Sequence, residues 1–460
     1  MNKVVGRAKI MLVLVLILSL GTLFFVGEYI FQAEKWVMSP GSPHVYNKNA
    51  GCGVIADRDG ILLMDTSNGR VYTENETLRK AIIHWLGDRQ GNISAPLLSY
   101  YADRVANFDI ISGVYGYGGV GGQVTLSLSA KLQMAALEAM GDKKGTLAVY
   151  NYKTGEILCA VTTPTFDPDN LPDIAGDTTG QWSGAYVNRF MKSTYIPGSI
   201  FKIVTAAAAL ETIPDIQEQT FTCNGETVYN ELAGDKVTCL AKHGEITFQE
   251  ALTYSCNCAF AQIADQLGGE TLQRYAEQFQ ITQSLSFDGM TTAEGNVTAA
   301  GEAPVMVAWS AIGQHKDMIN PCRYLTFMGA IANGGVGVEP HLVSQISGGS
   351  WKSYVVKSVS TGRIMSVDTA QTLQKLMRAN VADYYGDENF AGLTVCAKSG
   401  TAEVGGDRKP NAMFCGFATD EEYPLAFIVV VEEGDSGRRT CVPILQQVLA
   451  ACKAELGGNQ

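Results

Sequence analysis

The sequence predicts an α/β protein whose main sheet is assembled from two distant parts of the chain. Residues 145–163 form two alternating runs around a Lys-Thr-Gly turn, which is typical of a β-hairpin. Residues 199–335 have a mostly helical pattern, and β patterns return between 394 and 434. A last helix is predicted over about 438–455. Strands on both sides of a helical insert indicate one domain whose sheet combines N-terminal and C-terminal pieces.

A helix long enough to cross a membrane is predicted at the N-terminus, over residues 10–30. Its first seventeen residues carry no charge, and at about 1.5 Å per residue such a helix with its flanks crosses a hydrocarbon core of about 30 Å. Lys3, Arg7 and Lys9 precede it, so residues 1–9 are expected in the cytoplasm and the rest of the chain outside. A cleaved secretory signal is the alternative, but no small-x-small site follows the apolar run.

The composition argues against a nucleic-acid partner. The chain of 460 residues has 34 Lys and Arg against 46 Asp and Glu, for a formal net charge of −12. No basic stripe or Arg-rich segment is present. The five histidines show no paired-ligand spacing, so neither a metal nor another cofactor is expected.

Most of the eleven cysteines stand singly in apolar runs and are expected to be small core residues. Cys223 and Cys239 flank a polar, hairpin-like segment, and the sequence leaves open whether they pair in this exported chain. Cys256 and Cys258 form a Cys-x-Cys pair without His or Cys close by in the sequence, so a zinc site is not expected there.

The stretch "YIPGSIFK" places Ser199 and Lys202 at the start of a strongly apolar helical run. Residues three apart lie on one face of a helix, so the two side chains can meet. Ser199 also lies at the positive end of the helix dipole. Burial penalises an ammonium and favours neutral lysine, and a neutral lysine beside a serine is a general base beside a nucleophile. Alone, a Ser-x-x-Lys pattern has little weight, because it occurs by chance.

Two further polar clusters interrupt apolar runs. Ser255 and Asn257 lie in "YSCN", between two helical patterns, where a helix cap is the alternative explanation. Lys398 begins the run "KSGT" within a β pattern, and Gly400 in this run lets the backbone of a ligand approach closely.

In this order, Ser-x-x-Lys, Ser-x-Asn and Lys-Ser-Gly resemble the active-site motifs of penicillin-binding proteins and serine β-lactamases. The blocks "HGEITFQEAL", "AIGQHKDMINP" and "AIANGG" match as well, and the resemblance covers about residues 145–455. It implies a transpeptidase domain at 145–460 with a five-stranded antiparallel sheet flanked by helices and an all-helical subdomain. Residues 31–140 are then expected to form a smaller, non-catalytic α+β pedestal domain.

The resemblance also implies a role for each motif residue. Ser199 attacks the penultimate D-alanine carbonyl of a peptidoglycan stem peptide, and Lys202 takes its proton. Ser255 relays that proton to the leaving amine, and Asn257 holds the substrate amide. Lys398 attracts the terminal carboxylate and, as a like charge, helps to keep Lys202 neutral.

The remaining motif residues are implied to bind substrate: Ser399, Gly400 and Thr401. Thr401 contacts the carboxylate, and its backbone N–H forms the oxyanion hole with that of Ser199. Gly400 leaves the strand open for the acyl chain. A second Lys-Thr-Gly run begins at Lys153, but it lies in the turn of the first hairpin and precedes the nucleophile, so Lys153 is predicted to be dispensable.

The fate of the acyl-enzyme separates the subfamilies. No Glu-x-x-x-N segment lies between Asn257 and Lys398, and the run from Glu226 to Asn230 precedes the second motif. An amine acceptor is therefore expected rather than water, as in a short, monofunctional class B penicillin-binding protein that cross-links stem peptides and is inhibited by β-lactams. Such a protein is expected at the cell membrane, beside a membrane glycosyltransferase of the FtsW/RodA type, in division or elongation.

Two alternatives stay open. One is a hydrolase on the same scaffold, either a D,D-carboxypeptidase or a β-lactamase-like enzyme. The other is a non-catalytic β-lactam sensor or divisome scaffold, although such receptors usually carry several membrane spans and only nine residues precede this anchor. The chain also departs from the family at Gln314-His315, where Gln-Gly is more common. This departure is expected to alter the rim of the pocket.

Overall fold

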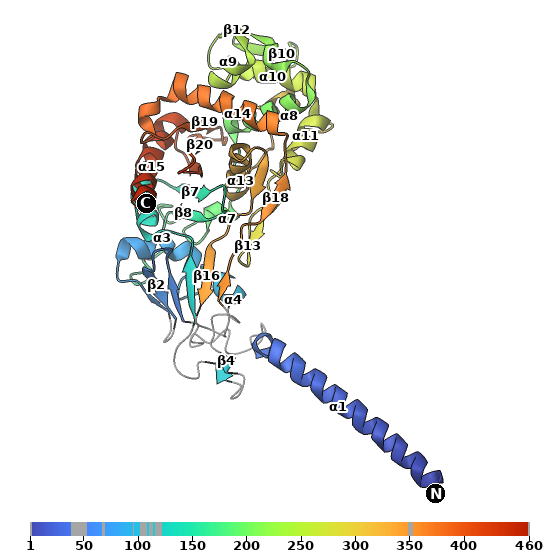
Figure 1. Cartoon of the computed structure of the whole chain (residues 1–460). Coiled ribbons are helices and arrows are strands. Elements are labelled where there is room, and N and C mark those ends of the chain that lie inside the picture. Colours follow the sequence, from blue (N-terminus) through green and yellow to red (C-terminus); the bar gives the residue numbers. More distant parts are fainter. Residues whose placement is uncertain are drawn as a thin grey trace.

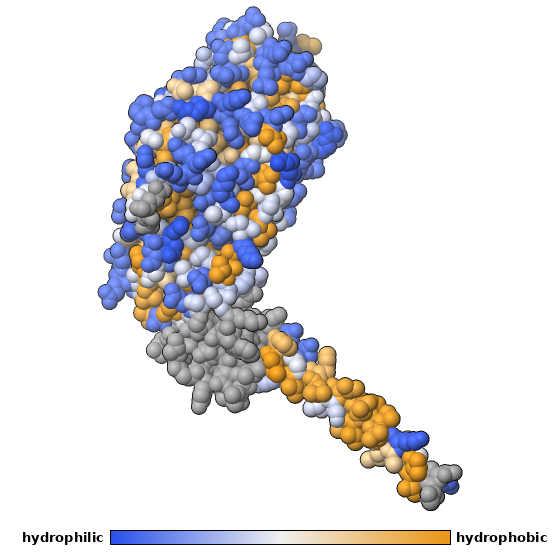
Figure 2. Space-filling view, in the orientation of Figure 1, coloured by the Kyte–Doolittle hydropathy of each residue, from blue (hydrophilic) through white to orange (hydrophobic). Residues whose placement is uncertain are grey.

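A computed structural model describes most of the chain. Most of the residues that are not described lie within the 31–140 segment. The described residues are 2–37, 53–66, 70–94, 96–101, 108–109, 114–115, 122–347 and 353–458. The chain begins with one long helix, α1 (Asn2–Val37), which projects away from the rest of the molecule (Figure 1). Within its segment Lys3–Gln32, a window of 18 residues has a mean hydropathy of 2.8, and none of that window is buried against protein. Apolar side chains cover most of its visible surface (Figure 2). By length and composition, α1 fits a membrane anchor.

The main sheet has five antiparallel strands in the order β19-β20-β21-β7-β8. β7 and β8 form the hairpin that the sequence predicts. β21 pairs with β7, so the sheet joins two distant parts of the chain, as expected from the strand patterns. The strands span β7 (Gly145–Asn151), β8 (Ile157–Thr163), β19 (Val395–Ala402), β20 (Asn411–Ala418) and β21 (Leu425–Val431).

Both faces of this sheet are buried by helices. In β20, Met413 and Cys415 pack into the core that contains residues of α8 and α13, whereas Ala412 and Phe414 pack into the core that contains residues of α6 and α15. Burial on both faces explains why the strands read as continuous apolar runs rather than alternating ones. The four helices span α6 (Ala130–Met140), α8 (Lys202–Thr212), α13 (Pro321–Ala332) and α15 (Val442–Gly457).

A helical subdomain lies at the end of the molecule remote from α1 (Figure 1). The expectation that this subdomain is all-helical is wrong. Two small antiparallel sheets lie between α8 and α9. β-branched and aromatic residues favour strands, and in β9 the side chains of Phe221 and Cys223 are buried while those of Thr220 and Thr222 are exposed. The elements span β9 (Thr220–Cys223), β10 (Glu226–Asn230), β11 (Asp235–Thr238), β12 (Gly244–Thr247), α9 (Phe248–Thr253), α10 (Asn257–Leu267), α11 (Gly269–Gln278), α12 (Pro304–Ala311) and α14 (Val367–Asn380).

The N-terminal part contains a second sheet, in the order β17-β16-β6-β1-β2-β3. β16 and β17 come from within the range predicted for the transpeptidase domain. Helix α3 is capped by Asn75 and docks on the main sheet, where Trp85 Nε1 donates to Ala160 O at 2.7 Å. The elements span β1 (Val54–Ala56), β2 (Leu62–Asp65), β3 (Val71–Tyr72), α3 (Glu76–Leu86), β6 (Gln123–Leu126), β16 (Val343–Ser347) and β17 (Tyr354–Val355).

Short elements complete the fold. The helices are α4 (Pro96–Tyr100), α7 (Arg189–Lys192), the 3-10 turns η1 (Gly198–Phe201), η2 (Ile216–Glu218) and η4 (Asp387–Asn389), and the π-helical turns η3 (Val381–Tyr385) and η5 (Gly437–Cys441). The strands are β4 (Phe108–Asp109), β5 (Val114–Tyr115), β13 (Ser286–Phe287), β14 (Met290–Thr291), β15 (Val336–Val338) and β18 (Ser360–Arg363).

Candidate active site

Lys202 lies at the centre of polar groups from two of the three predicted motifs. Its side chain is fully buried, and Nζ lies 2.7 Å from both Asn257 Oδ1 and the carbonyl oxygen of Ser255. Nζ also lies 3.0 Å from Ser199 Oγ and 3.0 Å from Ser255 Oγ. The structure therefore brings together Ser199, Lys202, Ser255 and Asn257 around one nitrogen.

This arrangement suits a neutral amine. Burial first, and then the positive charge of Lys398, hold the pKa of the Lys202 ammonium well below its usual range. The two shortest contacts are to carbonyl oxygens, which only accept, so they take the two N–H groups of the neutral amine. The nitrogen lone pair is then free to accept from a serine hydroxyl. Lys202 is in this way prepared to remove a proton from Ser199.

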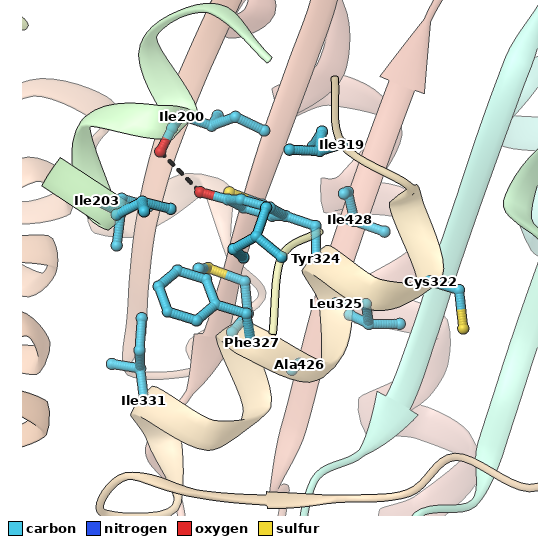
Figure 3. Close-up of a cluster of buried hydrophobic side chains, with 14 of the residues drawn as sticks. Ile200, Ile203, Ile319, Cys322, Tyr324, Leu325, Phe327, Ile331, Ala426 and Ile428 are labelled. Atoms are coloured by element: carbon cyan, nitrogen blue, oxygen red, sulfur yellow. Dashed lines mark hydrogen bonds between the residues drawn. The ribbon is translucent and has the colours of Figure 1, made fainter. Parts of the chain in front are cut away.

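The turn η1, which carries Ser199, is fixed by its neighbours on both sides. The backbone of Gly198 has φ +55° and its N–H donates to Gly313 O at 2.9 Å. Tyr324 of α13 donates to the carbonyl of Ile200 at 2.7 Å, and Figure 3 shows this bond above the apolar side chains that surround it. Ser199 therefore lies between two tethered residues, at the entrance of the buried helix α8.

The second motif lies at the start of α10. Ser255 adopts φ +55°, a left-handed conformation that reverses the chain before the helix, and Cys256 then caps α10. Asn257 turns its two amide ends in different directions, because Oδ1 accepts from Lys202 and Nδ2 donates to Thr238 O at 2.8 Å. The orientation of Asn257 thus depends on Thr238, the last residue of β11.

The third motif lies on β19, the edge strand of the main sheet. Lys398 is 1% exposed and donates to Ser399 O at 3.1 Å. Burial lowers the pKa of Lys398 to about 8. Since its charge also lowers the pKa of Lys202, the structure couples the first and third motifs electrostatically.

The outer edge of β19 is closed over one half and open over the other. Asn380 donates to Ala397 O at 3.0 Å, and the Ser399 N–H donates to Tyr385 Oη at 2.8 Å. Backbone groups two residues apart in a strand point the same way, so the N–H of Thr401 also points away from β20. Its carbonyl faces Gln314, whose Nε2 lies at 3.4 Å. The strand is open to a ligand at Thr401, which is exposed beside η1.

The residues of the two rejected motif matches lie outside this cluster. Lys153 is at the turn of the first hairpin, where it donates to Asn333 Oδ1 at 2.8 Å. Glu226 is on β10 and forms an ion pair of 2.9 Å with Lys236. The ring of His315 lies 3.5 Å from Glu302.

The expectation that Cys256 lacks His or Cys partners is wrong. The ligand atoms of Cys223, Cys239, His243 and Cys256 all lie within 4.8 Å of one another. Cys223 and Cys239 are free thiols. Sequence distance concealed this cluster, because the two small sheets bring segments up to 33 residues apart to the same place.

Tyr385 was not marked by any sequence motif, although it holds the third motif in place. Its hydroxyl accepts from the Ser399 N–H and lies 2.8 Å from Ser399 Oγ. We expect Tyr385→Phe to lower the free energy of unfolding by about 1–3 kcal/mol, because a buried N–H loses its acceptor. Thermal denaturation of the full chain in detergent measures this change. Tyr384→Phe alters an exposed neighbour and serves as the control, and equal stability of the two variants would refute the prediction.

Comparisons with known proteins identify the family of the chain. The family model of the penicillin-binding protein transpeptidase domain matches residues 145–450. Peptidoglycan D,D-transpeptidase PbpA of Mycolicibacterium smegmatis is 28% identical over 361 residues, which cover 73% of this chain and 73% of that protein. Stage V sporulation protein D of Bacillus subtilis is 28% identical over 340 residues, or 70% of this chain and 51% of that protein.

Solved structures share the fold. The D,D-transpeptidase domain of a peptidoglycan glycosyltransferase from Eggerthella lenta superposes with a TM-score of 0.75 at 25% identity, covering 89% of this chain and 99% of that one. The penicillin G acyl-enzyme complex of penicillin-binding protein A from Mycobacterium tuberculosis superposes with a TM-score of 0.69 at 23% identity. The match covers 87% of this chain and 99% of that one.

Proposed function

Because the chain belongs to the penicillin-binding protein transpeptidase family, we propose that it is a peptidoglycan D,D-transpeptidase that works through a serine acyl-enzyme and is acylated by β-lactams. The observation that carries this proposal is the contact of a buried lysine nitrogen with Ser199 Oγ and with both side chains of the Ser-x-Asn motif. The penicillin G acyl-enzyme of a relative with the same fold supports the chemistry.

In the acylation step, Lys202 takes the hydroxyl proton of Ser199 as Oγ attacks the penultimate D-alanine carbonyl. A bond forms between Oγ and the carbonyl carbon, and the amide C–N bond breaks. Ser255 lies 3.0 Å from Lys202 Nζ, so it can pass the proton to the departing D-alanine amine. Asn257, held by Thr238, orients the substrate amide.

The backbone N–H groups of Ser199 and Thr401 are proposed to stabilise the oxyanion. Thr401 lies on the open part of the β19 edge, where an extended stem peptide can add as a further strand. Lys398 supplies positive potential for the terminal carboxylate, and Thr401 contacts it. Ser399 and Gly400 shape the strand on which the acyl chain lies. Removing one oxyanion donor typically costs about 10²–10³ in rate.

An amine is proposed as the acceptor of the acyl group. Within the described residues, the hydrogen bonds of Lys202 go to hydroxyl, amide and backbone oxygens, and none goes to a carboxylate. Glu226, which fits the letters of a water-activating motif, is paired with Lys236 on β10. The amine of a second stem peptide then attacks the ester, which releases Ser199 and forms the cross-link.

For the placement in the cell, we propose a single membrane helix at 10–30 with residues 1–9 in the cytoplasm and the catalytic part outside. Lys3, Arg7 and Lys9 support this orientation. Residues 31–140 are proposed as a pedestal before the transpeptidase domain at 145–460. A membrane glycosyltransferase of the FtsW/RodA type is proposed as the partner that supplies glycan strands, by analogy with the family.

Labelling with penicillin tests the proposed function. We expect one adduct per chain in the intact mass, mapped to the peptide that contains Ser199, and no adduct in Ser199→Ala. Absence of labelling in the wild-type chain would favour a non-catalytic sensor or scaffold. With a chromogenic cephalosporin, a stoichiometric burst is expected, whereas sustained turnover would identify the chain as a hydrolase.

The pH dependence of acylation tests the roles of the two lysines. The rate is expected to fall as pH rises through about 8, because Lys398 then loses its charge. At low pH the rate falls when Lys202 becomes protonated. Because the pKa of Lys202 is lowered, this fall is expected at a pH well below the usual pKa of a lysine. Acylation rates of labelled penicillin across the pH range give both limits.

Lys398→Gln separates these two limits. It should abolish the fall near pH 8 and move the acidic limit to higher pH, because the like charge that lowers the pKa of Lys202 is removed. An acidic limit that stays unchanged in Lys398→Gln would disprove the electrostatic coupling of the two lysines.

A further inference from the structure

A cluster of four possible metal ligands lies directly beside the Ser-x-Asn motif. Cys223 ends β9, Cys239 follows β11, His243 precedes β12 and Cys256 caps α10. Their donor atoms all lie within 4.8 Å of one another. Cys223 and Cys256 are buried, and the other two are half-buried. Four separate segments of the chain thus converge on one point.

The distances match tetrahedral zinc better than a disulfide. A Zn–S distance of about 2.3 Å and tetrahedral geometry place two sulfur ligands about 3.8 Å apart, and Cys239 Sγ lies 3.9 Å from Cys256 Sγ. The same geometry with a nitrogen ligand at about 2.0–2.1 Å gives about 3.6 Å, and Cys239 Sγ lies 3.7 Å from His243 Nδ1. A covalent S–S bond is only about 2.0 Å long.

We propose that this cluster is a structural zinc site of the Cys₃His type, formed by Cys223, Cys239, His243 and Cys256. On binding, the three thiols release their protons to solvent, and the neutral imidazole donates through Nδ1. Four protein ligands fill the tetrahedral shell, so the ion has no open position for a water and takes no part in acyl transfer. Thiolate and imidazole ligands suit zinc rather than calcium or magnesium.

The contacts around the cluster indicate what the ion holds in place. Cys256 stands between Ser255 and Asn257, and Asn257 Nδ2 donates to Thr238 O, next to Cys239. The ring of His243 stacks on Tyr254, with centroids 5.5 Å apart and an angle of 7°. One ion would therefore fasten the loops of both small sheets to the turn that carries Ser255 and Asn257. The site acts as a positioning device for the second motif.

Metal analysis of the full-length chain tests the proposal. The chain is purified in detergent without chelators, and we expect about one zinc per chain. Refilling the chelated protein with Co²⁺ should give the strong visible absorption of tetrahedral cobalt with a thiolate charge-transfer band. Failure to bind zinc or cobalt would overturn the proposal. So would a disulfide, seen as two thiols that resist alkylation in the unreduced chain.

Variants assign the ligands. His243→Ala and Cys239→Ser should each weaken zinc binding by more than about tenfold. Cys258→Ala, beside the cluster, and Cys452→Ala, a buried thiol of the other core, should retain it. Zinc binding that survives in His243→Ala, or is lost in Cys258→Ala, would refute this ligand set.

The link to the active site has its own readout. Because the ion positions Ser255 and Asn257, metal-free protein should acylate with penicillin more slowly and recover on addition of zinc. Ser199→Ala should bind zinc normally while forming no adduct, so the metal site and the proposed transpeptidase activity can fail independently. An unchanged acylation rate without metal would overturn the positioning role.

Discussion

Replacing Lys202 by methionine is expected to slow acylation by penicillin about 10²- to 10⁴-fold, the usual contribution of a general base. Methionine fills a similar volume in the buried site but has no lone pair that can take the proton of Ser199. In the wild-type chain this nitrogen lies 3.0 Å from Ser199 Oγ. The second-order rate of adduct formation with labelled penicillin measures the effect.

The folded state should survive this replacement. Methionine leaves Asn257 Oδ1 and the carbonyl of Ser255 without their donor, which destabilises the protein, but it also removes an amine whose burial is unfavourable. Lys153→Met, in the other Lys-Thr-Gly run, is the matched control and should acylate normally. A Lys202→Met rate within tenfold of wild type would exclude Lys202 as the base.

The first motif was predictable because its geometry is local. Ser199 and Lys202 are three residues apart in a helical run, so backbone geometry alone brings their side chains together. Apolar runs likewise predicted the β7–β8 hairpin and the return to strands after residue 394. The meeting of Lys202 with Asn257 is a long-range contact, and it was expected only from the family resemblance.

Features that depend on contacts between distant parts of the chain could not be predicted from the sequence. β16 joins β6 across more than 200 residues, and neither strand shows which partner it has. β10 and β11, by contrast, pair locally, within the hairpin-like segment that the sequence indicates between Cys223 and Cys239. The Cys239–Cys256 contact exists only because the two small sheets fold back on α10. Tyr385 belongs to a π-helical turn and contacts Ser399 through its hydroxyl.

The close approach of η1 to β19 gives a second large effect. We expect Gly198→Ala to reduce acylation about 100-fold, because a displacement of about 1 Å in an active site has an effect of this size. A Cβ at Gly198 would lie 2.6 Å from Thr401 O and 3.0 Å from the carbonyl carbon of Thr401. Both are backbone atoms, so η1 and β19 must move apart, and Ser199 must move away from Thr401.

Backbone strain also contributes at Gly198, because its φ is +55°. Gly301→Ala separates strain from contact, since Gly301 has φ +73° and nothing within 4 Å of a built Cβ. Both variants should lose about 1–2 kcal/mol of stability from the left-handed conformation, but only Gly198→Ala should lose acylation. Wild-type acylation in a folded Gly198→Ala chain would show that the two oxyanion donors do not require this close contact between η1 and β19.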